Sequence, residues 1–403
     1  MSRPIRVLSL YEGFFAGGAR ILHSDLVAGL HASGRQEHAV LSIASAAVRE
    51  STVQSMDEDP RYRRLVSAGV GMTTLGRMAG VHPPERASFT DAELRIAADA
   101  VRSADVVLSL KEQPIGLLLA LRDRDMMPDV PVAACLHRSD PLHSGPALGW
   151  LVEGAATGLV TATVSCAAST SDAYARVGVA AGNRSVIANG IDTARFRPGN
   201  IEEDRLTRER LGIPAGAPVV VYAARFDAMK DPGLFLRAVA AHAVRRPDCH
   251  YVLCGAGMTW DNEAFAALAR ESSVVPSARV HPMGIVDDMP ALYRIADIVA
   301  LTSAFGEASP LCLIEGAACG ATPVTTDVGD AAARVEGIGV VTSHDASDIA
   351  SSWCDVLGRR GELRAAALAA RGRFGRERMI DGYRMVVEDL ASVRTAEDVS
   401  LAG

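Results

Sequence analysis

Residues 305–324 read FGEASPLCLIEGAACGATPV, and this stretch decides how the second half of the chain is interpreted. Two carboxylates, Glu307 and Glu315, stand in it with seven residues between them. Pro310 suits the first turn of a helix and Ser309 could cap it, which places Glu307 in the preceding loop and Glu315 inside the helix. A glutamate among so many apolar residues needs a partner or a ligand hydroxyl. The pattern predicts a binding loop at a helix N-terminus.

On both sides of this stretch, short apolar strands alternate with helix-period segments, which is typical of parallel α/β layers. The expected strands are residues 5–10, 38–43, 106–110, 132–136, 163–166, 185–188, 219–224, 250–254, 280–282, 298–301 and 323–326. Helices are expected over 18–33 and 232–244, and Thr90 with Glu93 forms a capping box. The segment 60–86 lacks a clean period and is expected to be an insertion of short helices and loops.

Length and composition favour two domains. A chain of 403 residues is too long for one comfortable core, and a hydrophobic content of 49% can fill two. The polar, proline-containing stretch before residue 219 is the best boundary. We predict a domain over residues 1–195, a linker over 196–218, a domain over 219–375 and a C-terminal helix over 376–403.

The net charge of −7 makes general binding to nucleic acid or to anionic membranes improbable. No segment has the apolar length to span a bilayer, and the N-terminus lacks a signal peptide's apolar region, so we expect a cytoplasmic protein without stable membrane attachment. The sequence does not indicate an oligomeric state. The seven cysteines include no C-x-x-C pair and are expected to be buried, reduced thiols rather than metal ligands.

Cations follow two of the predicted strands. Arg225 and Lys230 follow strand 219–224, where parallel sheets bind ligands, and their charges suit a diphosphate. The alternative is a loop ion pair with Asp227 or Asp231. Lys111 ends an earlier strand, and it and Lys230 are the only lysines in the chain. Their survival against an arginine-rich coding bias indicates either chemistry or chance.

Gly17 and Gly18 open the first helix, where backbone can approach an anion closely, although a structural turn is the alternative. The G-x-G-x-x-G fingerprint is absent, which argues against a dinucleotide site of a dehydrogenase. His137 ends strand 132–136. Taken alone, the position favours a local hydrogen bond beside Arg138 and Asp140.

Taken in order, these signals resemble the family 4 retaining glycosyltransferases, whose fold is called GT-B. The run from Glu307 to Glu315 is similar to the family's E-x7-E motif. The other matching pieces are Gly17-Gly18, His137, Asn189-Gly190-Ile191-Asp192 with Phe196 and Pro198, Arg225 with Lys230, and Met283-Gly284-Ile285-Val286. The resemblance covers most of residues 1–340. It implies two Rossmann-like domains with parallel sheets that face across a cleft, and a last helix that crosses back to the first domain.

The resemblance also implies a role for each matching residue. Arg225 and Lys230 would bind the donor diphosphate, and Glu315 the ribose hydroxyls. Glu307 would lie by the donor sugar, with the neighbouring backbone of Ala308, Ser309, Pro310 and Leu311. The base would lie against Gly284, Ile285 and Val286, the diphosphate would face Gly17 and Gly18, and His137 would lie near the transferred sugar. The sequence departs from the family at three positions. Ala308 stands where Gly is often found, Gly316 where Ala is usual, and Arg20 where an acidic residue is common. These departures leave the identity of the donor sugar open.

Such an enzyme separates a diphosphate from an anomeric carbon, and fixed cations with helix N-termini stabilise the departing charge. No metal or other cofactor is then expected, and no acidic D-x-D cluster is placed to hold a metal. The family retains anomeric configuration, and uracil is its usual base. Whether Glu307 or His137 assists the chemistry is left open.

The acceptor is open as well. Lys111 and Glu112 are candidates for its site, and the acidic chain favours a small soluble molecule. The arginine-rich coding bias is compatible with natural-product biosynthesis, such as that of an antibiotic. The arginines of segment 60–86 are expected to be solvated, or to bind an anionic acceptor or lipid phosphate. Alternative functions are a sugar-nucleotide epimerase, a disaccharide phosphorylase, and a non-catalytic protein that binds nucleotide sugars.

Overall fold

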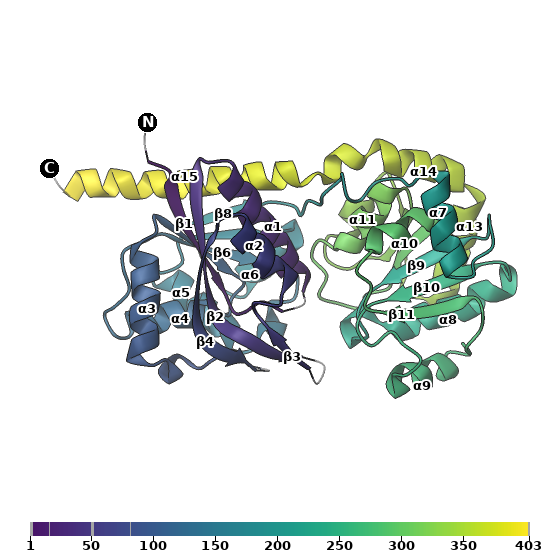
Figure 1. The fold of residues 1–403 in the computed structure, drawn as a ribbon, viewed down its shortest axis with the longest axis horizontal. Helices are drawn as coiled ribbons and strands as arrows, with labels where there is room; N and C mark the ends of the chain where they lie inside the picture. The colour runs from purple at the N-terminus through teal and green to yellow at the C-terminus, as the bar shows by residue number, and fades with distance from the viewer. Residues whose placement is uncertain (1–2, 16, 50–51, 81, 402–403) are drawn as a thin grey trace. The chain divides into compact units, whose positions relative to one another are not determined.

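The computed structural model describes residues 3–15, 17–49, 52–80 and 82–401, so parts of the predicted segments 1–195, 60–86 and 376–403 lie outside the described residues. The chain divides into two compact units (Figure 1). The first comprises Met1–Asn189 with Glu377–Gly403, and the second comprises Gly190–Arg376. Each unit is built on a sheet of mainly parallel strands joined by helices, with β3 of the first unit pairing antiparallel to β2, and this confirms the predicted α/β class. The cleft expected between the two sheets stays a prediction.

In the first unit, the strand order is β3-β2-β1-β5-β6-β7-β8, with β4 also paired to β2. Its strands are β1 (Ile5–Tyr11), β2 (Gln36–Arg49), β3 (Thr52–Ser55), β4 (Gly71–Ala79), β5 (Val106–Leu110), β6 (Val132–Leu136), β7 (Ala162–Ser165) and β8 (Asn183–Val186). Its helices are α1 (Gly18–Ala32), α2 (Pro60–Ser67), α3 (Asp91–Arg102), α4 (Ile115–Arg122), α5 (Pro146–Ala156), α6 (Ala168–Arg176) and, from Glu377 on, α15 (Arg376–Leu401). Strands β5 and β6 are buried throughout, because helices cover both faces of the sheet.

In the second unit, all six strands are parallel, in the order β11-β10-β9-β12-β13-β14. They are β9 (Val219–Ala223), β10 (His250–Cys254), β11 (Val280–Gly284), β12 (Ile298–Leu301), β13 (Thr322–Thr326) and β14 (Val340–Thr342). The helices are α7 (Ile201–Arg210), α8 (Pro232–Arg245), α9 (Glu263–Glu271), α10 (Met289–Ile295), α11 (Leu311–Cys319), α12 (Ala331–Val335), α13 (Ala346–Gly358) and α14 (Arg360–Ala369).

The segment 60–86 differs from the prediction. Instead of only short helices and loops, it contributes α2 and the strand β4, which pairs in parallel with β2. Four of the nine residues of β4 are exposed and only one is buried, and Gly76 within it adopts a φ of 77°. Its pairing with β2 is interrupted by two register shifts. A half-exposed, irregular strand of this kind leaves no clean apolar period in the sequence.

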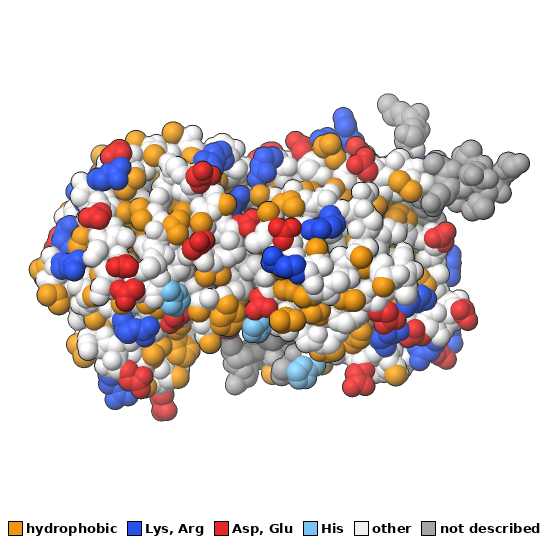
Figure 2. Space-filling view, turned by 180° about the vertical axis from the view of Figure 1, so that it is seen from behind, with side chains coloured by type: hydrophobic (Ala, Val, Ile, Leu, Met, Phe, Trp, Pro, Cys, Tyr) orange, Lys and Arg blue, Asp and Glu red, His pale blue; other side chains and the backbone are white. Residues whose placement is uncertain are grey.

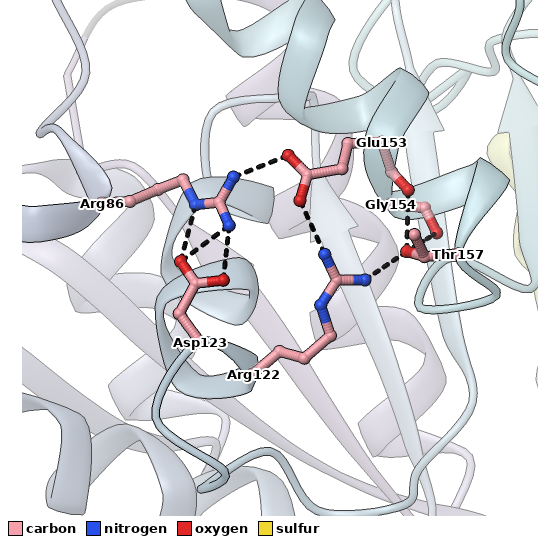
Figure 3. Close-up of polar contacts among 6 residues, drawn as sticks. All are labelled: Arg86, Arg122, Asp123, Glu153, Gly154 and Thr157. Carbon is pink, nitrogen blue, oxygen red and sulfur yellow. Dashed lines mark hydrogen bonds and ion pairs between the residues drawn. The ribbon is translucent and has the colours of Figure 1, made fainter.

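The arginines of this segment have partners within the fold. Arg61 pairs with Asp59, Arg64 with Asp25, and Arg77 with Glu93. Arg86 donates to both Asp123 and Glu153, which makes it part of a larger network (Figure 3).

That network joins three elements. Glu153 on α5 accepts from Arg86 and also from Arg122 at the end of α4, at 2.7 Å, and Arg122 continues it to Thr157 (Figure 3). The arginines therefore form ion pairs that join elements of the first unit. These contacts do not favour the alternative that the arginines bind an anionic acceptor or a lipid phosphate.

The predicted linker over 196–218 also differs from the structure. It contains α7, and Arg208 on that helix donates to the carbonyls of Pro214, Ala217 and Ile295. These contacts make the segment part of the second unit, whose boundary lies at Gly190. Proline and polar residues indicated a linker, but Asn200 caps α7 and forms a capping box with Glu203.

The described surface carries both charge signs. On the face shown in Figure 2, acidic and basic side chains are interspersed. Five of the seven cysteines are buried, as predicted, whereas Cys312 and Cys354 are half-buried. No helix among the described residues has the length and apolarity needed to cross a membrane.

Candidate functional site

The carboxyl ends of β9 and β12 meet in the middle of the second sheet, and hydrogen bonds join the loops that leave them. The amide of Ala304 donates to the carbonyl of Met229 at 2.9 Å. Thr302 Oγ1 donates to the carbonyls of Lys230 and Asp231 at 3.2 and 3.1 Å. Tyr222 OH donates to the Lys230 carbonyl at 2.6 Å. These bonds hold the two loops together as one platform.

On this platform Lys230 and Glu307 form an ion pair. Lys230 Nζ donates to Glu307 Oε1, and Ser303 Oγ donates to the same oxygen at 2.6 Å. The two side chains are only 17% and 7% exposed, so the pair is largely shielded from water. The sequence predicted a role for each residue in one site, and the structure brings them into direct contact.

Arg225 lies at the rim. Its side chain is 56% exposed, and its Nε donates to Asp227 at 2.9 Å. Arg225 thus makes one of the loop ion pairs given as the alternative, and its contact with a diphosphate stays a prediction. Lys230 makes neither of those pairs, because its partner is Glu307, while Asp231 caps α8 and contacts His344 Nε2 at 3.0 Å.

Glu315 has the partner that its apolar surroundings require. It lies on α11, and the buried Tyr293 on α10 donates its OH to Glu315 Oε2 at 3.2 Å. Burial raises the pKa of Glu315 to about 7, while Tyr293 and Arg195 act in the opposite direction. Tyr293 was not predicted as a site residue, because nothing in the sequence connects it to Glu315.

The turn that follows β13 supports the loop between Glu307 and α11. The carbonyl of Ala308 accepts from the amide of Asp330 at 3.0 Å. The turn at Gly329 approaches so closely that a Cβ there would lie 1.9 Å from the Glu307 carbonyl oxygen. Helix α11 begins at Leu311 with Pro310 at its N-cap, so Ser309, expected as the cap, stands one residue before it.

A second loop follows β11. The amide of Gly284 donates to the Met258 carbonyl at 2.8 Å, and its own carbonyl accepts from Gly255 at 2.7 Å. Gly284 adopts a φ of 63°, which glycine tolerates best. Ile285 is 70% exposed, whereas Val286 packs against the core. An exposed apolar side chain over a fixed glycine turn suits contact with a flat ring.

In the first unit, Gly17 and Gly18 open α1 as predicted. Arg20, where the family commonly has an acid, is folded back beneath the loop. Its Nε donates to the Gly13 carbonyl and its Nη2 to Glu12, both at 2.8 Å. It also lies 3.5 Å over the ring of Phe15. This departure thus has a structural role in the glycine loop.

His137, Lys111 and Glu112 lie at the neighbouring ends of β5 and β6. Burial lowers the pKa of His137 to about 3, with His23 and Lys111 acting in the same direction, so the ring is neutral near pH 7. The buried Glu112 accepts from Ser144 at 2.9 Å and from Tyr174. These neutral partners account for its burial, and its contact with an acceptor stays a prediction.

Comparison with known proteins gives the following matches. Residues 217–359 match the family model described as Glycosyl transferases group 1. D-inositol 3-phosphate glycosyltransferase of Salinispora arenicola is 33% identical over 233 residues, which cover 54% of this chain and 52% of that protein. The enzyme of the same name from Acidothermus cellulolyticus is 31% identical over 264 residues, covering 62% and 57%. This chain spans about half the length of the curated relatives it matches.

Among solved structures, HepE of Anabaena in complex with UDP matches with a TM-score of 0.75 and 18% identity, covering 96% of this chain and 100% of that one. Sucrose-phosphate synthase of Thermosynechococcus elongatus matches with a TM-score of 0.73 and 17% identity over the same shares. At this identity the likeness concerns the fold alone. It confirms the predicted fold class, the GT-B fold with two Rossmann-like domains.

Proposed function

We propose that the protein is a retaining glycosyltransferase, because residues 217–359 match the family model of the group 1 glycosyltransferases and the sequence carries the motifs that resemble family 4. It moves a sugar from a nucleotide diphosphate donor, a UDP-sugar, to a small soluble acceptor. In the transfer, the bond from the anomeric carbon to the diphosphate breaks and a bond to the acceptor oxygen forms on the same face. The acceptor proton passes to the leaving phosphate oxygen.

The observation that carries this proposal is the Lys230–Glu307 pair with Arg225 at the strand ends. The Lys230 side chain is held by the Glu307 carboxylate, and its backbone carbonyl accepts hydrogen bonds from Tyr222 and Thr302. A cation held in place before the reaction needs no reorganisation as negative charge develops on the leaving diphosphate. The amides of Ala308, Ser309 and Leu311, at and just before the start of α11, would add donors for the same charge.

Glu315 and the loop 284–286 supply the nucleoside end of the proposed site. A carboxylate can accept from both ribose hydroxyls, and Tyr293 holds that of Glu315 in position. Uracil as the base is supported by the structures of HepE with UDP and with UDP-glucose. Cation-based stabilisation makes a bound metal unnecessary in this proposal.

A small acceptor is supported by the name of the relatives, whose acceptor is D-inositol 3-phosphate. In the proposal Gly17, Gly18 and His137 of the first unit serve the transfer, with the neutral ring of His137 near the sugar. A place in natural-product or antibiotic biosynthesis rests on the coding bias alone and stays a prediction.

Turnover tests the proposal against its alternatives. The chain would be incubated in EDTA with UDP-, GDP-, ADP- and TDP-sugars and a panel of polyol and sugar-phosphate acceptors. We expect acceptor-dependent release of UDP and a product whose NMR coupling shows retained configuration. An epimerase would convert the donor sugar without an acceptor. A phosphorylase would form sugar phosphate in a separate incubation with a disaccharide and inorganic phosphate, without a nucleotide, and a binding protein would release nothing.

A further inference from the structure

The cluster of interest lies within the first unit, at the carboxyl ends of three adjacent strands. Strand β5 pairs with β1 on one side and with β6 on the other. Glu12, Lys111 and His137 follow directly after these three strands, and the amide of Lys111 donates to the Cys135 carbonyl at 3.0 Å. The register of the sheet therefore places these residues in one row.

Two cations in this cluster have no anionic partner. Within the described part of the chain, neither Lys111 Nζ nor the guanidinium of Arg138 makes an ion pair or a side-chain hydrogen bond, although neither side chain is fully exposed. The two nearby acids are engaged elsewhere. Glu12 pairs with Arg20, and Glu112 accepts from Ser144 and Tyr174.

The backbone of Lys111 is unusual as well. Its φ is 68°, in the left-handed region that residues other than glycine seldom adopt. Such conformations persist where the surrounding structure enforces them, and they concentrate at binding and catalytic sites. The strained residue is one of only two lysines in the chain. Both features single out the position of the Lys111 side chain.

A buried polar atom lies in the same row. Nε2 of His137 is inaccessible to solvent and has no hydrogen-bond partner among the residues that the structure describes. Asp140, three residues after His137, contacts His143 Nδ1 at 2.7 Å. A buried polar atom left without a partner is rare in folded proteins and suggests a ligand or ordered water beside it.

We propose that Lys111 and Arg138 bind an oxyanion on the acceptor, a phosphate or a carboxylate, beside His137. This inference rests on the proposed function and names the acceptor class of that reaction. Burial and the like charges of Arg20 and Arg138 lower the pKa of Lys111 to about 8, while Glu112 and Glu12 act in the opposite direction. An anion placed between the two cations relieves that repulsion and supplies both with charge-assisted hydrogen bonds.

Calorimetry on the full chain tests the site, with inorganic phosphate as the probe and with UDP present at saturation. We expect phosphate to bind, and Lys111→Met and Arg138→Gln each to lower its affinity about tenfold, the loss of one charge-assisted hydrogen bond. Lys111→Arg keeps the charge and should retain most of the affinity. Arg35→Ala is the matched control. Arg35 is exposed in the turn before β2 and therefore lies at the amino ends of the parallel strands, away from the carboxyl ends that carry the proposed site.

The pH dependence adds a readout that a merely structural role would not give. Phosphate affinity should fall as the pH rises above about 8, since the free site then loses the Lys111 proton. Lys111→Met should abolish that fall.

Two further titrations distinguish the source of the anion. In the parent chain we expect D-inositol 3-phosphate to bind more tightly than myo-inositol. In Lys111→Met we expect this difference to be lost. If instead Lys111→Met selectively weakens UDP-glucuronate relative to UDP-glucose, the anion belongs to the donor sugar and the assignment to the acceptor is wrong. Absence of phosphate binding while UDP binds would overturn this inference alone. Absence of UDP binding would overturn the proposed function.

Discussion

The Glu315 carboxyl titrates near neutral pH, and this makes donor binding sensitive to pH. Its pKa is raised to about 7, so the group is mostly protonated at pH 6 and mostly ionised at pH 8. Ribose hydroxyls donate to the ionised form, so donor affinity should rise with pH, by roughly tenfold between these two values. Calorimetry with a UDP-sugar, whose own phosphates do not titrate there, measures this rise.

Glu315→Gln is the control for that prediction, since an amide of the same shape cannot titrate. The variant should bind the UDP-sugar weakly and equally at both pH values. Tyr293→Phe keeps the ring but removes the OH that lies 3.2 Å from the carboxylate, and should weaken binding several-fold. A pH-dependent affinity that survives in Glu315→Gln would assign the titration to another group.

At the scale of residues, the sequence indicated which positions matter better than how they contact one another. The spacing of Glu307 and Glu315 and the strand-end position of Lys230 placed all three at one edge of the second sheet. Their partners, Ser303 for Glu307 and Tyr293 for Glu315, were not predicted. Ser303 lies only four residues before Glu307, but a serine at this spacing in a loop is not a distinctive pattern. Tyr293 lies 22 residues before Glu315 on another helix, and only the fold brings these two together.

At position 316 on α11, where the family usually has alanine, the neighbouring side chain of Val299 explains why this chain has glycine. A Cβ at this position would lie 2.6 Å from Val299 Cγ1 on β12. Replacing a helical glycine with alanine usually gains about 1 kcal/mol, but overpacking a core costs about 1–3 kcal/mol. We expect Gly316→Ala to lower the melting temperature. Gly149→Ala, on α5 with nothing within 4 Å, should raise it, and equal gains for both would contradict the packing argument.

The turn after β13 should act on the site through the loop it supports. In Gly329→Ala, the new Cβ would meet the Glu307 carbonyl and displace the loop that carries Glu307. We expect a loss of about 2 kcal/mol in stability and a clear loss of UDP affinity. Gly337→Ala is the matched control. Its φ of 75° is similar, but open space surrounds it, so it should lose some stability and keep its affinity.

At the scale of elements, buried regular strands were predicted well and irregular ones were not. Strands β5, β6, β10 and β12 have the predicted bounds, because continuous apolar runs mark strands that are covered on both faces. The capping box of α3 was also confirmed. Strand β4 was missed because it is half exposed and interrupted, and β14 because it has only three residues.

At the scale of the whole molecule, the end of the chain completes the first unit. Met379, Tyr383, Val387 and Leu390 of α15 are each at most 5% exposed, and Ile380 packs against Gly29 of α1. Burial of four such side chains contributes roughly 6–12 kcal/mol as an upper estimate, which is comparable with the stability of a domain. A chain ending at Arg376 should therefore lose the thermal transition of the first unit.

Circular dichroism melts of two truncations check this. A chain ending at residue 393 keeps all four buried side chains and should melt like the parent. A peptide of residues 377–393 added to the shorter chain should restore part of the lost transition. An unchanged melt for the chain that ends at Arg376 would contradict the account. The sequence predicted this helix from a family resemblance, and burial of the four side chains gives the physical reason.

The boundary between the units was predicted less well than their number. Composition placed a linker over 196–218, yet contacts of Arg208 place this segment in the second unit. Tertiary contacts of this kind leave no trace in local composition. The two units themselves follow from alternating strands and helices that continue along the whole chain.

The central claim is that the loops after β9 and β12 form a metal-independent site for a nucleotide diphosphate. Calorimetric titration of the full chain with UDP in EDTA tests it most directly. We expect UDP to bind the parent chain and Arg210→Ala, an exposed residue before β9, with the same affinity. Lys230→Met should bind at least about tenfold more weakly, with its fold checked by circular dichroism. Equal binding by Lys230→Met, or binding only after a divalent cation is added, would contradict the claim.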